Sequence, residues 1–384
     1  LKEFNLGEHI EKVQERDEGL IRTGKIATVI GDIHGDMNVL LTGLMGSGIL
    51  KLESPPIMMY KMGKPASQKC TLEEFNTLPK KEQCEYQPIP NFSFIKEKID
   101  EEIVVLGDIL DRGEHDQVCL ALLMDLAYRE NSPLKIVLGD HEIYGLSNKV
   151  SCRLPIIPSN YGDRSDEAQL QCSDSQFRLV RDTLNQAFQD QTIKFAHLSE
   201  NGMLYSHSMF ERGWLNGQKP SGQTPVNESF KYLNLMEALA EENFEDYQNH
   251  LTQVVDCLNE KFRDMSSDGR DHTSDSMVSG ESPLWSRSRD GALPWMMCVG
   301  HTNQKVFDRG KLLDQPLLTA AADDAQGLGG ELTDAGKHIY LCDFGSFFMA
   351  HKRGSDSWNS VPIYTKVSNG KLVVNRIKPE VSKR

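Results

Sequence analysis

Apolar, β-branched runs alternate with stretches of helical periodicity in the first third of the chain. Runs at residues 26–30, 103–106 and 136–138 predict short buried strands. Residues 37–50 and 115–131 repeat apolar side chains at helical spacing, so a helix is expected after each of the first two strands. Strand, helix and strand in this order predict a βαβ unit with parallel strands and a right-handed crossover.

The C-terminal half has a different pattern, because two Asn-Gly pairs each separate two apolar runs. These are Asn201-Gly202 between 193–198 and 203–206, and Asn369-Gly370 between 363–367 and 372–377. Asn-Gly in this setting is the strongest short signal for a β-hairpin, so an antiparallel arrangement is expected here. The two halves together predict an α/β (α+β) fold, a mixed two-sheet sandwich flanked by helices.

Three segments fall outside this regular pattern. Residues 1–24 are polar and are expected to form a short helix or arm before one domain that spans residues 25–384. Residues 51–101 hold six prolines, a density that breaks both helix and central strand, so they are interpreted as an insertion on the rim of the sheet. Both a flap and a plain surface loop fit this insertion. A second insertion, at about 225–282, predicts a helical hairpin whose apolar stripe packs against its own domain.

The composition is that of a soluble globular protein, with 39% hydrophobic and 26% charged residues. A formal net charge of -14 excludes a general nucleic-acid surface, because phosphate backbones require clustered Lys and Arg. No apolar stretch is long enough to span a membrane. The eight cysteines form no CxxC pair and no disulfide framework, which predicts a reducing, cytoplasmic environment. The oligomeric state stays open.

Each predicted strand is followed by a short segment rich in Gly, Asp and His. These segments are GDIHG at residues 31–35, GDILDRG at 107–113 and GDHE at 139–142. The carboxyl ends of parallel strands are where open α/β sheets build their sites. Asp and His offer mixed oxygen and nitrogen ligands for transition metals, and two such ions can clamp a phosphate for in-line displacement. Two further histidines, His207 and His301, end apolar runs later in the chain and complete the candidate set.

In order and in most identities, these segments resemble the signature GDxHG, GDxxDRG and GNHE of the phosphoprotein phosphatase (PPP) family of binuclear metallophosphoesterases. The resemblance covers the catalytic segments from Gly31 to about Asp343. It implies a metal-dependent protein phosphatase that hydrolyses phosphoserine, phosphothreonine or phosphotyrosine monoesters by attack of a metal-bridging hydroxide. It also implies phosphoprotein substrates and two divalent ions, with manganese expected and iron or zinc as alternatives.

The long insertions are similar to those of a bacterial effector branch of the family, the Wip phosphatases of Legionella. Delivery into a host cell as an effector is therefore a further hypothesis. The N-terminal residues do not form a secretory signal, and such delivery would not require one.

The resemblance assigns the metal ligands position by position. Asp108 would bridge both ions, His301 would bind the first ion and His207 the second. The full set of expected ligands is Asp32, His34, Asp108, Asp140, His207 and His301.

The remaining motif residues would act on the phosphate and on the leaving group. His141 would protonate the leaving oxygen as a general acid, and Asp111 would orient its imidazole. Arg112 would hold a phosphate oxygen, because a planar guanidinium matches phosphate geometry. A second phosphate-binding arginine should follow the PLWS segment, with Arg287 preferred and Arg289 as the rival.

Asp140 departs from the family pattern, which has Asn at this position. An ionised Asp can still bind a hard cation, but it cannot donate a hydrogen bond to the phosphate and it adds a negative charge. An attenuated enzyme that keeps its metals is therefore expected.

Simpler interpretations and other functions compete with this one. Asp and His at strand ends could be turn residues and caps, although turn chemistry does not require His twice. His207 could be structural, because Ser208 follows it where the family has Gly. The alternative functions are a small-molecule phosphatase, such as a dinucleotide polyphosphate hydrolase, and an attenuated phosphopeptide-binding pseudophosphatase. Retention of His141 and Asp111 favours an enzyme, since a pure binder needs no acid.

Overall fold

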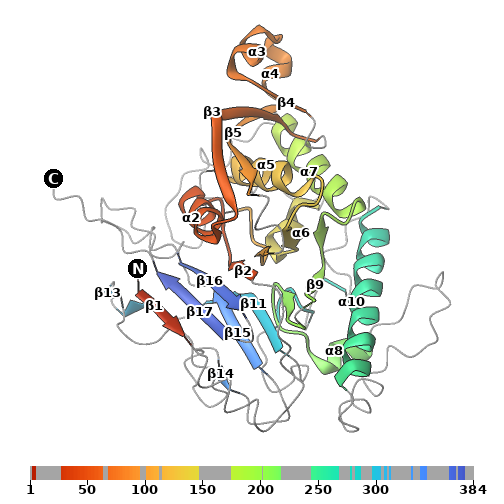
Figure 1. Cartoon of the computed structure of the whole chain (residues 1–384). Helices are drawn as coiled ribbons and strands as arrows, with labels where there is room; N and C mark the ends of the chain where they lie inside the picture. Colours follow the sequence, from red (N-terminus) through yellow and green to blue (C-terminus); the bar gives the residue numbers. More distant parts are fainter. Residues whose placement is uncertain are drawn as a thin grey trace.

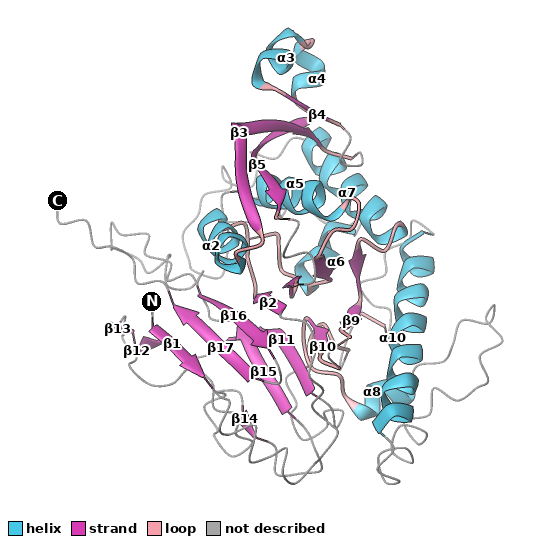
Figure 2. Cartoon of the chain, in the orientation of Figure 1, coloured by secondary structure: helices cyan, strands magenta, loops and turns pink. Residues whose placement is uncertain are grey.

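The computed structural model describes the chain in segments, shown by secondary structure in Figure 2. The described residues are 2–5, 27–63, 68–95, 101–111, 115–146, 174–200, 202–217, 244–267, 277–278, 282–286, 296–303, 307–308, 311–312, 330–331, 338–343, 363–368 and 371–376.

Strands and helices alternate in the first half of the chain. In order they are β1 (Lys2–Asn5), β2 (Ala27–Ile30), α2 (Met37–Ser47), β3 (Leu50–Lys61), β4 (Lys69–Cys70), α3 (Leu72–Thr77), α4 (Lys80–Gln83), β5 (Tyr86–Phe94), β6 (Glu102–Val105), α5 (Asp116–Ala127), β7 (Leu134–Val137), α6 (Asp140–Leu146) and α7 (Asp174–Gln189).

Strands dominate the second half. These elements are β8 (Ile193–Lys194), β9 (Ala196–Leu198), β10 (Leu204–Ser206), α8 (Arg212–Gly217), α10 (Phe244–Ser267), β11 (Met296–Asn303), β12 (Phe307–Asp308), β13 (Lys311–Leu312), β14 (Gly330–Glu331), β15 (His338–Asp343), β16 (Ile363–Ser368) and β17 (Lys371–Arg376).

Seven strands form the larger sheet, in the order β1-β17-β16-β2-β6-β7-β8. Figure 1 shows β1, β17 and β16 side by side in this sheet. β2, β6, β7 and β8 are parallel neighbours, which confirms the βαβ pattern predicted for the first third of the chain. Every residue of β2 and β6 is buried. Because successive side chains of a strand point to opposite faces, both faces of the sheet are covered here.

The edge of this sheet is built by the two ends of the chain. β16 and β17 form the hairpin that Asn369-Gly370 predicted. β1 pairs with β17, so residues 2–5 form an edge strand and not a helix, while the rest of the expected N-terminal arm, residues 6–24, lies outside the described residues.

The smaller sheet has the order β14-β15-β11-β10-β9. β9 and β10 are antiparallel around Gly202, as predicted, but β10, β11 and β15 are parallel. The expectation of an antiparallel arrangement therefore holds for β16 and β17 but not for β11 and β15. The apolar run at 193–198 also divides at Phe195, since β8 joins the larger sheet and β9 the smaller one. The architecture is thus an α/β arrangement of mixed sheets with helices on their flanks.

Two helices follow the first two motifs and begin at the carboxyl edge of the larger sheet. The Asp36 carboxylate caps α2 by accepting the N–H of Asn38 at 2.8 Å. α2 ends before the predicted residue 50 because Gly48 adopts a left-handed conformation with φ of 71°. α2 contacts β2 and β16, and α5 contacts β7, so both helices cover the same sheet.

Residues 50–94 form a ribbon of β3, β4 and β5 with α3 and α4 at its far end (Figure 1). This ribbon is called the arm from here on, and it is distinct from the N-terminal arm expected at residues 1–24. The prolines therefore do not exclude strands, contrary to the sequence-based expectation. A ribbon of few strands tolerates them because a missing N–H on an outer edge breaks no ladder bond. The β3–β5 register also shifts between Leu52 and Ile57, around Pro55 and Pro56.

The predicted helical hairpin at 225–282 is found in part. α10 is its second helix, while residues 218–243, where the first was expected, lie outside the described residues. Its apolar face, which includes Leu251, Leu258 and Phe262, is buried against α7 and β9. The stripe thus packs against the chain's own domain, as expected. Among the helices described, none is long and apolar enough to cross a membrane.

Candidate metal centre and its surroundings

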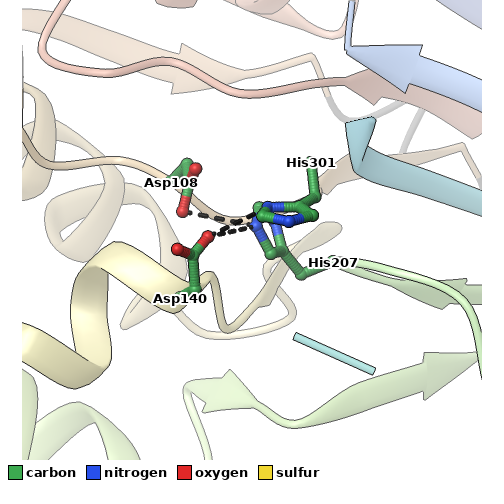
Figure 3. Close-up of side chains that lie close together, drawn as sticks. All are labelled: Asp108, Asp140, His207 and His301. Carbon is green, nitrogen blue, oxygen red and sulfur yellow. Dashed lines mark hydrogen bonds and ion pairs between the residues drawn. The ribbon is translucent and has the colours of Figure 1, made fainter. Parts of the chain in front are cut away.

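Four predicted ligands from four separate segments converge at one point (Figure 3). Asp108 follows β6, Asp140 begins α6, His207 follows β10 and His301 lies in β11. One ligand atom from each side chain lies within 4.8 Å of the other three. Carboxylate oxygens and imidazole nitrogens that meet so closely form the donor set of a divalent transition metal.

The orientation of the His207 imidazole is fixed by the ring nitrogen that faces away from the centre. His207 Nδ1 donates to the Leu106 carbonyl at 2.7 Å, which leaves Nε2 facing the centre. That Nε2 atom lies 2.8 Å from Asp140 Oδ1 and 3.4 Å from Asp108 Oδ1. His301 Nδ1 lies 3.2 Å from the same Asp140 oxygen. His207 is therefore a residue of the centre, which disfavours a purely structural role.

A second group of possible ligands comprises His34, Asp108 and His141, again within 4.8 Å of one another. His34 Nδ1 lies 3.2 Å from the Leu110 carbonyl, so Nε2 faces Asp108 Oδ2 at 3.4 Å. Asp108 belongs to both groups, which is the position expected of a bridging ligand.

Asp32 and His301 are linked through the backbone. Asp32 Oδ1 accepts the backbone N–H of His301 at 3.1 Å. The imidazole of His301 falls in the group of Asp140 and His207, whereas the resemblance assigned it to the first ion with Asp32 and His34. The structure thus places the His301 imidazole with the ligands expected for the second ion and not with those expected for the first.

His141 and Asp111 form the predicted imidazole–carboxylate pair. His141 Nδ1 lies 2.6 Å from Asp111 Oδ2. The other nitrogen, Nε2, points toward the ligand group and lies 3.9 Å from Asp108 Oδ2. Asp111 is itself held, because its backbone N–H donates to the buried carboxylate of Asp116 at 3.1 Å.

The last residue of the third motif, Glu142, holds the second motif in place. Its Oε2 accepts the N–H groups of Asp108 at 3.0 Å and Gly139 at 2.9 Å. Its Oε1 accepts those of Ile109 at 2.9 Å and Leu110 at 3.1 Å. Glu142 is fully buried, so water is not available as an alternative acceptor for these four backbone N–H groups. Glu142 and Asp116 were not among the predicted site residues, although Glu142 stands inside a motif.

The backbone at the centre is strained. Among the described residues, six other than glycine have a positive φ, and four of these are His34, Asp108, Asp111 and His301. Left-handed backbone costs such residues roughly 1–2 kcal/mol each. Gly139 allows the close approach that this requires, because a Cβ there would lie 2.1 Å from the Asp108 nitrogen. Strain gathered in this way is typical of functional sites.

Burial and the neighbouring carboxylates shift the pKa values of the groups at the centre. Burial, and next the charge of Asp140, raise the pKa of Asp108 to about 7. Burial alone would raise the pKa of Asp140, but hydrogen bonds with His207 and His301 hold it well below the usual carboxyl value. Burial lowers the pKa of His141, yet the charge of Asp108 and the Asp111 contact outweigh it and raise that pKa to about 9. An excess of carboxylate at one point is the condition that a divalent cation satisfies.

The predicted phosphate-binding arginines, Arg112, Arg287 and Arg289, lie outside the described residues. The PLWS segment that precedes Arg287 is described, and it lies beside the centre. The Ser208 N–H donates to the Pro283 carbonyl at 2.5 Å, and the Trp285 ring meets His301 edge-on with centroids 5.8 Å apart.

The chain matches the family model of the calcineurin-like phosphoesterases over residues 27–318. It therefore belongs to this family of metallophosphoesterases, which use divalent metals. The matched residues include every candidate ligand named above.

Solved structures give more distant similarities. A cold-active protein-tyrosine phosphatase of a psychrophilic Shewanella species is 14% identical, with a TM-score of 0.47 over 92% of this chain and 80% of that one. The phosphatase domain of the Legionella effector WipB is 16% identical, with a TM-score of 0.39 over 71% of this chain and 98% of that one. No curated protein sequence matches the chain. Nothing about the substrate follows from these similarities.

Proposed function

We propose that this phosphoesterase is a metal-dependent phosphoprotein phosphatase of the PPP type, acting on phosphoserine, phosphothreonine or phosphotyrosine. The observation that carries the proposal is the Asp111–His141 pair, whose imidazole faces a buried Asp/His ligand group. A proton donor beside a cation site is what cleavage of an alkyl phosphate needs, because the leaving alkoxide is a strong base.

The chain's own residues would divide the work as follows. Asp108, Asp140, His207 and His301 would hold one cation, and His34, Asp32 and Asp108 the other, with manganese as the expected metal. Bound divalent cations polarise phosphoryl oxygens and lower the pKa of water. Asp111 accepts the Nδ1 proton of His141, and the neighbouring carboxylates favour the imidazolium, which carries a second proton on Nε2. His141 would deliver this Nε2 proton to the leaving oxygen.

The same Asp111 contact could also orient His141 as a metal ligand, since carboxylates often support ligating histidines. His141→Ala separates these roles. If His141 is the general acid, the variant keeps two metal ions per chain and loses far more activity on a phosphoserine peptide than on an activated aryl phosphate. Loss of an ion, or equal loss on both substrates, would refute this role.

The substrate class is tested on the unmodified protein with added Mn. Paired phosphothreonine and phosphotyrosine peptides and a dinucleotide polyphosphate are compared by kcat/KM. The proposal expects a peptide to be preferred. Preference for the dinucleotide would establish a small-molecule phosphatase, and binding of peptides without turnover would establish a pseudophosphatase.

We also propose a reducing environment for the working protein. Cys119, Cys298 and Cys342 are buried, and the described part of the chain holds no disulfide. Delivery into a host cell stays a prediction.

A further inference from the structure

A groove of about 520 Å³ lies between the arm and the two helices that follow the first two motifs. α2 contributes Met37, Leu41 and Met45, β3 contributes Leu52 and Ile57, and β5 contributes Phe92. None of the candidate metal ligands lines it. The groove is therefore separate from the centre described above.

Exposed apolar side chains gather at this groove. Four large hydrophobic residues are exposed in the described part of the chain, and three of them line it: Met45 at 49%, Leu52 at 49% and Ile57 at 52%. The fourth, Leu72 at 54%, begins α3 at the far end of the arm. Single exposed apolar residues are ordinary, but a cluster along a groove marks a binding surface.

Two of the lining residues lie close in sequence to the loops that carry candidate metal ligands. Met37 stands three residues after His34 and is one of the residues that line the groove. His115, which follows the second motif, lines the groove too, and its N–H donates to the Gly35 carbonyl at 3.1 Å. A molecule in the groove would therefore lie next to the catalytic loops, which suits a segment of the substrate itself.

The chemistry of the lining restricts the occupant. Pro56 on β3 and Pro88 and Pro90 on β5 also line the groove, and proline offers no N–H for an added strand. An extended peptide would leave its backbone groups without partners among these apolar side chains. A helix satisfies its own backbone and can present apolar side chains one turn apart. Half-exposed side chains at the lip favour such a partner over a small molecule, which pockets enclose.

Two further features refine this partner. Met37 and Met45 are flexible side chains that adapt to different apolar surfaces. The net charge of -14 favours a helix whose polar face is basic.

We propose that this groove binds the apolar face of a basic amphipathic helix in the phosphoprotein substrate, which adds a docking site to the phosphatase proposed above. The helix would be tethered to the phosphorylated residue by the substrate's own chain. Docking would then raise the local concentration of the phosphate at the centre.

Two synthetic phosphopeptides test this with the full-length protein. Both carry one phosphorylated segment, a flexible Gly/Ser linker and a basic helix about five turns long. In one peptide leucines recur at i, i+4 and i+7, and in the other the same leucines are scattered around the helix. The first should have a KM about tenfold lower, with similar kcat.

The variants use exposed positions, so that folding is preserved. Leu52→Glu and Ile57→Glu put charges at the lip and should abolish the difference in KM between the two peptides. Leu72→Glu is the matched control, because it lies on the same arm with similar exposure but outside the groove. Turnover of an aryl phosphate should be unchanged in all three. Equal behaviour of the Ile57 and Leu72 variants would overturn the proposal.

Direct binding separates this proposal from the phosphatase assignment. The leucine-striped helix without phosphate, carrying a fluorophore, should bind the wild type and the Leu72→Glu variant but not the Ile57→Glu variant. This result stands even if no peptide is hydrolysed. Two other results would overturn the docking site: a dimer that Ile57→Glu converts to a monomer, or binding of phosphatidylcholine vesicles that the same variant abolishes.

Discussion

Glu142→Gln should destabilise the chain strongly, although it changes a single atom type. Each carboxylate oxygen of Glu142 accepts two backbone N–H groups, at 2.9–3.1 Å. An amide retains one oxygen, so two of the four donors would face an NH₂ group. A buried donor left without a partner costs about 1–3 kcal/mol, which gives a loss of about 2–6 kcal/mol. This loss is a large share of the roughly 5–15 kcal/mol by which a typical folded domain is stable against unfolding.

Urea unfolding of the metal-free protein measures this loss. Glu73→Gln is the control, because Glu73 is exposed on α3 and the change should cost less than about 0.5 kcal/mol. The variant should also bind metal more weakly, on the order of 10–100-fold, since Glu142 positions the backbone of Asp108. A change in unfolding free energy below about 1 kcal/mol would show that the four hydrogen bonds are worth little, and the reasoning would be wrong.

Three more results are expected. Asp116→Ala should lower turnover of a phosphoserine peptide by about tenfold and leave turnover of an aryl phosphate unchanged. Asp116→Asn should restore turnover of the peptide, because the amide oxygen can still accept the Asp111 N–H. Equal activity of the two variants on the peptide would contradict this role of Asp116. In metal-free protein the His141 imidazole should titrate near pH 9 by NMR. Because this folded pKa is raised, its contribution to stability is complete below about pH 6.5 and is lost as the pH rises through 9; bound metals should lower the pKa. Asp140→Asn should raise turnover and lower the apparent KM without a change in fold, whereas loss of metal or activity would show that Asp140 is an adapted ligand.

Local patterns predicted the elements whose signals are local. The apolar runs before the three motifs gave β2, β6 and β7, and the Asn-Gly pairs gave two hairpins. The parallel pairing of β10, β11 and β15 could not be read in this way, because the partners are far apart in the sequence and each run is short. The strands of the arm were missed because proline was weighed as in a central strand.

The residue types of the centre were predictable, but the contacts that arrange them were not. Asp and His at strand ends pointed to metal ligands, since few other roles require both. Three of the backbone N–H groups that Glu142 accepts belong to residues 32–34 positions earlier in the chain. A hydrogen bond between residues so far apart in the sequence leaves no local pattern from which it could be predicted. The group to which His301 belongs is set by its contact with Asp140 at 3.2 Å and by a left-handed backbone with φ of 54°, and neither can be read from the sequence.

The positive φ angles at His34, Asp108, Asp111 and His301 set the stability of the fold against the geometry of the centre. Glycine would occupy such backbone at lower free energy, but it carries no side chain that could bind a cation or move a proton. Each of the four residues therefore lowers the stability of the chain while it brings a functional group to the centre. Replacing any of them by glycine relieves the backbone and removes that group in the same step.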